Sequence, residues 1–303
     1  MSGAFLACDW GTTHVRAWLV EADGAVRASQ TFPLGVSRLR PGEAASRFRD
    51  DIRPALGAED LPAVLCGMIG SNLGWTPVPY LDCPTDASTF SAALHPAPGD
   101  DAAWIAPGLR GPGLTAAPDV MRGEETQVFG WLAQDSARGR GSHVICLPGT
   151  HAKWALVEDG RIVRFVTAMT GELFHLLSHY GVLRTEALVD DLRAFRVGAE
   201  AAGDGGGLAA RLFSARSRVV GASAPAAETA SYLSGLLIGA EIAGVPELLG
   251  VKSPGPTVLI GEPSLCEWYL MAFEHRGLSA SVYDGGKAAL AGLSALHAAR
   301  SRR

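Results

Sequence analysis

The sequence predicts an α/β protein with two related lobes, and three observations lead to this prediction. One is a repeat, because Gly11–Gly24 and Gly149–Gly160 both read Gly-Thr, then Trp, then an apolar run, then Asp-Gly. Another is the alternation of short apolar runs with longer helical patterns, which is typical of α/β layers. The third is the length of 303 residues, which exceeds the usual size of one hydrophobic core.

Each copy of the repeat predicts a strand, a tight turn, a strand, a second turn and a third strand. A short apolar run precedes each copy, at Ala4–Cys8 and at Val144–Leu147. The polar segment Gln134–Ser142 lies just before the second copy, so we place the lobe boundary there. The N-terminal lobe is then residues 1–141 and the C-terminal lobe residues 142–303.

The rest of the chain alternates in the same way. The segment from Thr76 to Pro118 is rich in Pro and Gly, which favours strands and loops over helix. The other expected strands are Ala63–Cys66 and Thr257–Ile260. The expected helices are Ala44–Ile52, Glu124–Ala133, Gly171–His179, Thr185–Phe195, Ala227–Ala243, Leu265–Arg276 and Gly285–His297.

The composition argues against several classes of protein. The formal net charge of −5 argues against nonspecific nucleic-acid binding, which needs a basic surface. The five cysteines are scattered without a C-x-x-C pair, so we expect reduced thiols and neither a zinc site nor a disulfide framework. The N-terminus lacks the pattern of a signal peptide, and no apolar stretch of about 18 residues occurs, so we expect a cytoplasmic protein that does not enter a membrane.

The two Gly-Thr turns are candidate phosphate sites. A strand-turn-strand with small residues directs backbone N–H groups and a hydroxyl toward one point, which suits an anion. The candidate residues are Gly11, Thr12 and Thr13 in the first turn and Gly149, Thr150 and His151 in the second. A glycine fits there if the backbone approaches another group closely or adopts positive φ. Neither G-x-x-x-x-G-K-[ST] nor G-x-G-x-x-G after a strand is present.

Asp9 ends the first apolar run, immediately before the first turn. A carboxylate repels a neighbouring phosphate unless a cation lies between them, so the position predicts bound Mg²⁺. The alternative is that Asp9 caps the turn as an Asx motif.

A second acidic position opens the helix expected from Glu124. Acidic residues in a first helical turn are ordinary partners of the helix dipole. A kinase acting on an alcohol, however, also needs a carboxylate that orients the hydroxyl and accepts its proton. Both interpretations remain open for Glu124 and Glu125 on these grounds.

The order of these motifs resembles the superfamily of sugar kinases, heat-shock ATPases and actin. The resemblance implies two ribonuclease-H-like lobes with an interlobe cleft, ATP and Mg²⁺ as cofactors, and an adenosine contact at Gly261 in Val258–Glu262. The segment Gly123–Gly130 is similar to the Gly-Asp-Gln segment of carbohydrate kinases, whose Asp is the base. The matching residue is Glu124, with Glu125 as its rival.

A set of motifs extends in order along the chain: Asp9–Thr13, Gly67–Ser71, Pro79-Tyr80, Met121–Gln127, Leu147–His151, Lys153-Trp154, Met169–Phe174 and Leu233–Gly239. Together they resemble the 2-dehydro-3-deoxygalactonokinase family, and the resemblance extends from Cys8 to the last helix. It implies transfer of the ATP γ-phosphoryl group to the C6 hydroxyl of 2-dehydro-3-deoxy-D-galactonate, in galactonate breakdown. Asn72-Leu73 departs from the Arg-Gln that the family pattern predicts after Ser71.

A sugar-acid substrate carries a carboxylate, so its pocket should contain a cation. The candidates are Arg16, Arg122 and Lys153. Ser71, Asn72 and Trp75 are further candidates for the sugar pocket, which should combine polar groups with an aromatic wall. For Trp75 a packing role is equally open.

Two other hypotheses about the function stay open. One is a non-catalytic sensor of the same fold that binds a sugar acid, and the other is a kinase for a different hexonate or sugar. The expected partners are ATP and a small sugar acid, with no nucleic acid and no membrane. A homodimer is left open.

Overall fold

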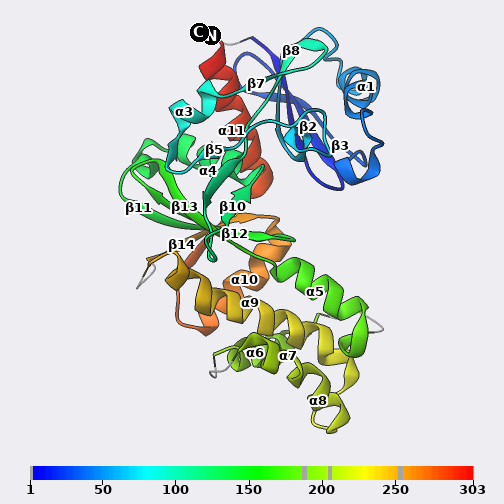
Figure 1. Cartoon of the computed structure of the whole chain (residues 1–303), viewed down its shortest axis with the longest axis vertical. Coiled ribbons are helices and arrows are strands. Elements are labelled where there is room, and N and C mark those ends of the chain that lie inside the picture. Colours follow the sequence, from blue (N-terminus) through cyan, green and yellow to red (C-terminus); the bar gives the residue numbers. More distant parts are fainter. Residues whose placement is uncertain (1–2, 186–189, 204–206, 252–254, 303) are drawn as a thin grey trace. The chain divides into compact units, whose positions relative to one another are not determined.

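The structure is a computed structural model that describes residues 3–185, 190–203, 207–251 and 255–302 (Figure 1). In spatial order its first sheet is β3 (Val26–Phe32), β2 (Val15–Val20), β1 (Phe5–Trp10), β4 (Ala63–Gly67), β8 (Asp100–Ile105) and β7 (His95–Ala97). The second is β15 (Ala280–Asp284), β14 (Thr257–Gly261), β11 (Ser142–Leu147), β12 (Ala152–Glu158), β13 (Arg161–Ala168) and β6 (Thr85–Asp86). A small sheet contains β10 (Pro118–Met121), β9 (Leu109–Pro112) and β5 (Leu81–Asp82). The α/β class predicted from the sequence is confirmed.

The two larger sheets share a strand order. The order β3-β2-β1-β4-β8 in one corresponds to β13-β12-β11-β14-β15 in the other. In each, the three strands of one sequence repeat are followed by two later strands. Strand β1 pairs in parallel with β4, as β11 does with β14. The sequence repeat therefore corresponds to a repeat of topology.

The chain divides into two compact units. One comprises Met1–Ser142, Val157–Arg164 and Gly285–Arg303, and the other His143–Leu156 and Phe165–Asp284. The boundary between functional lobes that we expect after residue 141 stays a prediction. The compact units assign the last helix, α11 (Gly285–Arg300), to the first unit, because it packs on β1 and β4.

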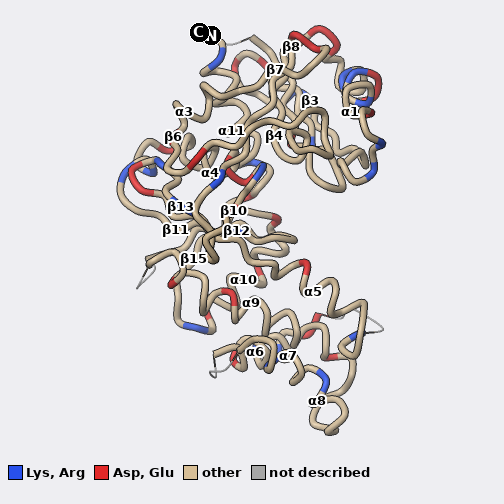
Figure 2. The backbone as a smooth tube through the Cα atoms, viewed as in Figure 1, with Lys and Arg blue, Asp and Glu red and all other residues tan. Residues whose placement is uncertain are grey.

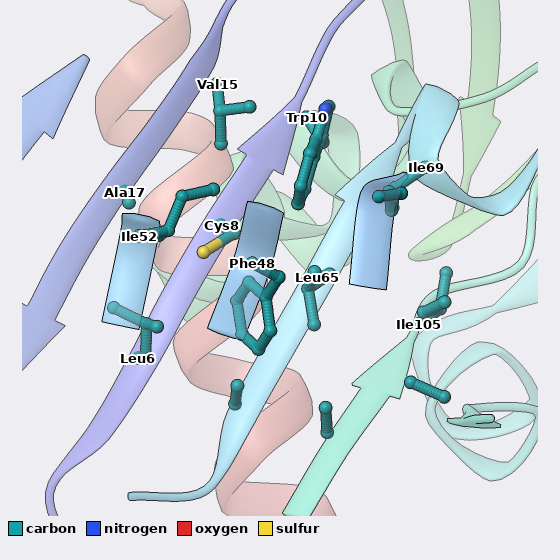
Figure 3. Close-up of a cluster of buried hydrophobic side chains, with 14 of the residues drawn as sticks. Leu6, Cys8, Trp10, Val15, Ala17, Phe48, Ile52, Leu65, Ile69 and Ile105 are labelled. Carbon is teal, nitrogen blue, oxygen red and sulfur yellow. The ribbon is translucent and has the colours of Figure 1, made fainter. Parts of the chain in front are cut away.

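The core of the first unit lies on one face of its sheet. Alternation along β1 places Leu6, Cys8 and Trp10 on this face, where they meet Phe48 and Ile52 (Figure 3). Those two side chains come from a short helical segment made of α1 (Ala44–Arg47), a π-helical turn (Phe48–Ile52) and α2 (Arg53–Ala55). The segment contains both acidic and basic residues (Figure 2), and Arg47 pairs with Glu43 and Asp51. The opposite face of β1 is covered by α11, which also packs on α4 (Glu124–Ala133).

The second unit is rich in helices: α5 (Thr170–His179), α6 (Leu192–Ala201), α7 (Leu208–Leu212), α8 (Ser214–Val220), α9 (Thr229–Leu248) and α10 (Pro263–His275). The long helix α9 packs against α5, α6 and α10. Its contact with α6 is close, because a Cβ on Gly235 would lie 2.0 Å from the carbonyl oxygen of Phe195. Glycine at position 235 therefore allows the two backbones to meet.

The helix expected at Thr185–Phe195 is displaced: residues 186–189 lie outside the described residues, and the helix is α6, which begins only at Leu192. Another expectation about the elements is wrong. The segment from Thr76 to Pro118 contains a helix, α3 (Ala87–Ala92). Asp86 starts it, because the Asp86 carboxylate accepts a hydrogen bond of 2.8 Å from the Thr89 N–H. The Pro and Gly content of the surrounding loops concealed this short helix.

Candidate active site

The turn between β1 and β2 is fixed by its carbonyl groups. The carbonyl oxygens of Gly11, Thr12 and Thr13 accept backbone N–H bonds from Val36, Ser37 and Gly35 at 3.2, 2.9 and 3.1 Å. Among the described residues, the amides of Thr12 and Thr13 donate no backbone hydrogen bond. Both threonines are exposed. The turn therefore presents amide donors to solvent, as a phosphate site requires.

Asp9 lies beside this turn. Its carboxylate accepts a hydrogen bond of 2.5 Å from Arg16 Nη2, because the register of β1 and β2 places the two residues opposite each other. A surface pocket is lined by both side chains together with Gly11, Thr13 and His14. The Asp9 side chain is 12% exposed, so the carboxylate faces this pocket from a largely buried position.

The end of β4 lies close both to Asp9 and to the residue before α4. Gly67 ends β4 with φ of +87°, and a Cβ there would lie 2.6 Å from the Trp10 carbonyl oxygen and 3.3 Å from Asp9 Oδ1. Gly123 precedes α4 with φ of +113°, and a Cβ there would lie 3.2 Å from the Gly67 Cα. Glycine at both positions lets the end of β1 and the start of α4 approach each other closely.

Two adjacent carboxylates begin α4 and bend back toward its N-terminus. Glu124 is partly exposed, and its Oε2 accepts a bond of 3.0 Å from the Arg122 N–H. Glu125 is fully buried, and both its oxygens lie 2.8 Å from the Gly123 amide nitrogen. Burial, and secondarily the charge of Glu124, raises the pKa of Glu125 to about 7. Glu124 is thus the carboxylate that a ligand can reach, and Glu125 holds the helix start in place.

Cys66 lies close to Asp9 and to the carboxylates at the start of α4. Its Sγ is 3.7 Å from Asp9 Oδ1, on the strand next to β1. Burial raises the pKa of the Cys66 thiol well above its usual value, with smaller contributions from the charges of Asp9 and Glu125. The predicted metal ligand and the start of α4 thus lie close together in the first unit.

Arg122 is buried beside the same helix start. Its Nη2 donates a bond of 2.8 Å to the Val78 carbonyl oxygen, and the guanidinium lies 4.2 Å from the centre of the Tyr80 ring. Within the described residues, Nε and Nη1 have no hydrogen-bond partner. Nη1 lies over Gly70, where a Cβ would come within 2.8 Å of it. A buried charge with unpaired donors is costly unless a ligand completes it.

The other residues predicted for the sugar pocket are distributed over the loop after β4. Ser71 is nearly buried and its hydroxyl donates to the Met68 carbonyl oxygen, whereas Asn72 is exposed. Trp75 packs against Phe48 and donates to the Pro98 carbonyl oxygen at 3.0 Å. Trp75 therefore contributes to the core packing of the first unit.

In the second unit, the turn between β11 and β12 lies against the start of α5. The Thr150 carbonyl oxygen accepts a bond of 2.9 Å from the Glu172 N–H, and the Glu172 carboxylate is hydrogen-bonded to His151. A Cβ on Gly171 would lie 2.4 Å from the Gly149 carbonyl oxygen. This contact was not predicted from the sequence, although Met169–Phe174 is among the motifs of the family resemblance.

Three further predicted residues lie in or near this second turn: Gly149, Lys153 and Gly261. Gly149 has open space where a Cβ would stand, and its φ, like that of Gly11, is not positive. Positive φ is therefore not the reason for glycine at either position. Gly261 ends β14 with its Cβ position 3.5 Å from Pro148, and Lys153 Nζ donates to Thr167 Oγ1 at 2.8 Å.

Two features are absent from the described residues. No described helix combines the length and the apolar character needed to span a membrane. In the same residues, three or more His, Cys, Asp or Glu side chains do not gather into a metal-binding group.

The fold is similar to that of solved structures with low sequence identity. It matches the ADPNP-bound activator of the 2-hydroxyisocaproyl-CoA dehydratase from Clostridium difficile with a TM-score of 0.52 at 12% identity, covering 99% of this chain and 96% of that one. At this identity the match concerns the fold alone.

The chain belongs to the 2-keto-3-deoxy-galactonokinase family, whose model matches residues 9–296. It is 34% identical to a probable 2-dehydro-3-deoxygalactonokinase of Rhizobium meliloti, with 97% of this chain and 96% of the relative covered. It is 33% identical to the 2-dehydro-3-deoxygalactonokinase of Escherichia coli, with 98% of both covered. The crystal structure of a putative 2-dehydro-3-deoxygalactonokinase from Sinorhizobium meliloti is 34% identical and matches with a TM-score of 0.86, covering 98% of this chain and 99% of that one.

Proposed function

We propose that this protein transfers the γ-phosphoryl group of ATP to the C6 hydroxyl of 2-dehydro-3-deoxy-D-galactonate, a step of galactonate catabolism. The observation that supports this most is the meeting of Asp9, the first glycine turn and the start of α4 within the first unit. A phosphate site, a cation site and an accessible carboxylate are the parts that phosphoryl transfer to an alcohol requires.

Glu124 is the proposed base. The C6 oxygen attacks the γ-phosphorus, the bond from that phosphorus to the β–γ bridging oxygen breaks, and ADP leaves with the bonding electrons. The hydroxyl proton passes to the Glu124 carboxylate, which is partly exposed, unlike that of Glu125. The N–H of Arg122 holds this carboxylate in place.

The ATP phosphates are assigned to both glycine turns. Thr12 and Thr13, with Gly11, bind from the N-terminal lobe (1–141), while Gly149, Thr150 and His151 bind from the C-terminal lobe (142–303). This assignment requires two ribonuclease-H-like lobes with an interlobe cleft. Gly261 is the proposed adenosine contact, beside Pro148 of the second turn.

Asp9 is the proposed ligand of Mg²⁺, which would neutralise charge on the phosphates. The fit rests on the donor type, because Mg²⁺ is commonly held by one or two carboxylates together with phosphate oxygens and water. The Asp9 carboxylate faces the same pocket as Gly11 and Thr13. The hydrogen bond from Arg16 orients the carboxylate toward it.

The substrate carboxylate is assigned to Arg122. Of the three candidate cations, Arg16 is hydrogen-bonded to Asp9 and Lys153 to Thr167, whereas Arg122 has two N–H groups without a partner among the described residues. Both atoms are shielded from water, so the Tyr80 ring or the loop after β4 must shift when the carboxylate binds. Ser71 and Asn72 are the proposed polar contacts to the sugar hydroxyls.

A coupled assay of ADP release tests the proposal. ADP should form when both ATP and 2-dehydro-3-deoxy-D-galactonate are present, and Glu124→Gln should lower kcat by about 10²–10⁴-fold. A panel of 2-keto-3-deoxy acids compared by kcat/KM identifies the preferred acceptor. Binding of the acid without ADP formation would instead identify a sensor, and a higher kcat/KM for another acid would change the substrate.

A further inference from the structure

Glu241 is a buried carboxylate in the middle of α9, remote in sequence from both glycine turns. It is 5% exposed and accepts hydrogen bonds from Trp154 Nε1 at 2.6 Å and from the Tyr269 hydroxyl at 2.9 Å. The Thr170 hydroxyl is a third donor. A buried carboxylate with three donors is satisfied, so the cluster fixes the positions of the residues that donate to it.

Thr170 connects this cluster to the second glycine turn. It is the first residue of α5, and the next residue, Gly171, lies directly against the turn. A Cβ on Gly171 would be 2.4 Å from the Gly149 carbonyl oxygen and 2.8 Å from the Thr150 Cα. The bond from the Glu172 N–H to the Thr150 carbonyl oxygen completes the contact. The position of the turn is therefore coupled to the position of Thr170.

Trp154 provides a second connection from the same carboxylate. It lies in β12, the strand that leaves the turn, and is fully buried. Glu241 thus holds both the strand after the turn and the helix that packs on it. Between these two points, the amides of Gly149, Thr150 and His151 donate no backbone bond within the described part of the chain.

We propose that Glu241 is a positioning residue for nucleotide binding, acting through Thr170 and Trp154 to hold the second glycine turn in the shape that binds phosphate. The inference rests on the proposed function only in taking a nucleotide phosphate as the ligand of that turn. Glu241 touches neither substrate, and the sugar acid is assigned to residues of the other unit. Loss of the Thr170 link should therefore weaken nucleotide binding selectively.

The test removes the Thr170 hydroxyl with little change of volume. Thr170→Val should raise both KM for ATP and Kd for ADP by about tenfold, the size expected for one hydrogen bond to a charged group. KM for the sugar acid should stay within about twofold. Thr170→Ser, which keeps the hydroxyl, should restore nucleotide affinity. The matched control is Ser178→Ala, because Ser178 is buried on the same helix but bonds to the helix itself, at the His175 carbonyl oxygen.

A second variant addresses the carboxylate. Glu241→Gln should also weaken ADP binding, whereas Glu247→Gln on the exposed side of α9 should not. Equal changes in KM for both substrates, or unchanged nucleotide affinity in folded Thr170→Val, would overturn the inference. Kd for ADP is measured without turnover, so it tests this inference separately from the proposed function. A wild type that binds ADP but phosphorylates no sugar acid would reject the proposed function. The inference would then be decided by the effect of the variants on Kd for ADP.

Discussion

A Cβ on Gly123 would lie 3.2 Å from the Cα of Gly67, so the loop after β4 and the start of α4 meet backbone to backbone. On its other side, Gly67 meets the carbonyl oxygen of Trp10. Three segments that are distant in sequence are therefore stacked without side chains between them. The stack fixes the separation of Asp9, at the end of β1, from Glu124, at the start of α4.

Gly67→Ala should therefore be strongly destabilising. The new Cβ would meet the Trp10 carbonyl oxygen at 2.6 Å, in a backbone with φ of +87°. We expect the free energy of unfolding to fall by about 3 kcal/mol, as the sum of the left-handed penalty and the clash. Gly99→Ala is the matched control, because Gly99 has φ of +79° but nothing within 4 Å of a Cβ, and should cost about 1 kcal/mol. Equal costs in urea unfolding would show that the stack can relax.

Asp9→Asn should weaken the response to Mg²⁺. The amide keeps the shape of the side chain but removes the charge that attracts the cation. We expect the Mg²⁺ concentration for half-maximal ADP formation to rise by at least about tenfold, with a lower kcat. Asp23→Asn serves as the control, because Asp23 is exposed in the turn before β3. A variant with the Mg²⁺ dependence of the wild type would support the capping role considered for Asp9.

Much of the fold and part of the site could be predicted from the sequence, because local patterns determine them. The Gly-Thr, Trp and Asp-Gly order of the repeat gave both three-stranded segments, and α4 begins at Glu124 as expected. The burial of Glu125 was not predictable, since it depends on the positive φ of Gly123, which lets the carboxylate fold back. Nor was the link from Glu241 to Thr170, which joins two helices through tertiary packing. Side-chain partners of this kind leave no periodic signal.

Glu125→Gln should change how stability depends on pH. The pKa of Glu125 is raised from 4.5 to about 7, so its favourable contribution is complete below pH 4.5 and is lost as pH rises through 7. The wild type should lose up to about 3 kcal/mol relative to the variant between pH 4.5 and pH 8, because one pKa unit corresponds to about 1.4 kcal/mol. Urea unfolding at several pH values measures this difference.

Glu43→Gln is a control of opposite sign. The pKa of Glu43 is lowered, chiefly by the hydrogen bond from the Arg40 N–H, so its contribution is present above pH 4.5 and is lost as pH falls. The wild type should therefore become more stable relative to Glu43→Gln as pH rises. If Glu125→Gln followed the same direction, the pKa of Glu125 would be lowered, not raised, in the folded protein.

Arg122→Met should remove the preference for a charged substrate. Methionine fills much of the same volume but offers no donor, so a bound carboxylate would lose its partner. We expect kcat/KM for the sugar acid to fall about a hundredfold, the lower range for truncating a buried charge pair. The analogue with a carboxamide in place of the carboxylate should change by no more than about threefold. The measured quantity is the ratio of kcat/KM for acid and amide.

Arg53→Met distinguishes this effect from loss of folding. Arg53 is also buried in the first unit, but it donates to the carbonyl oxygens of Ala58 and Leu61 and pairs with Asp100. Its loss should lower stability and leave the ratio of acid to amide as in the wild type. If Arg122→Met instead kept the wild-type ratio, the carboxylate would bind elsewhere. Arg16→Met and Lys153→Met would then be compared by the same ratio, since each removes one of the remaining cations.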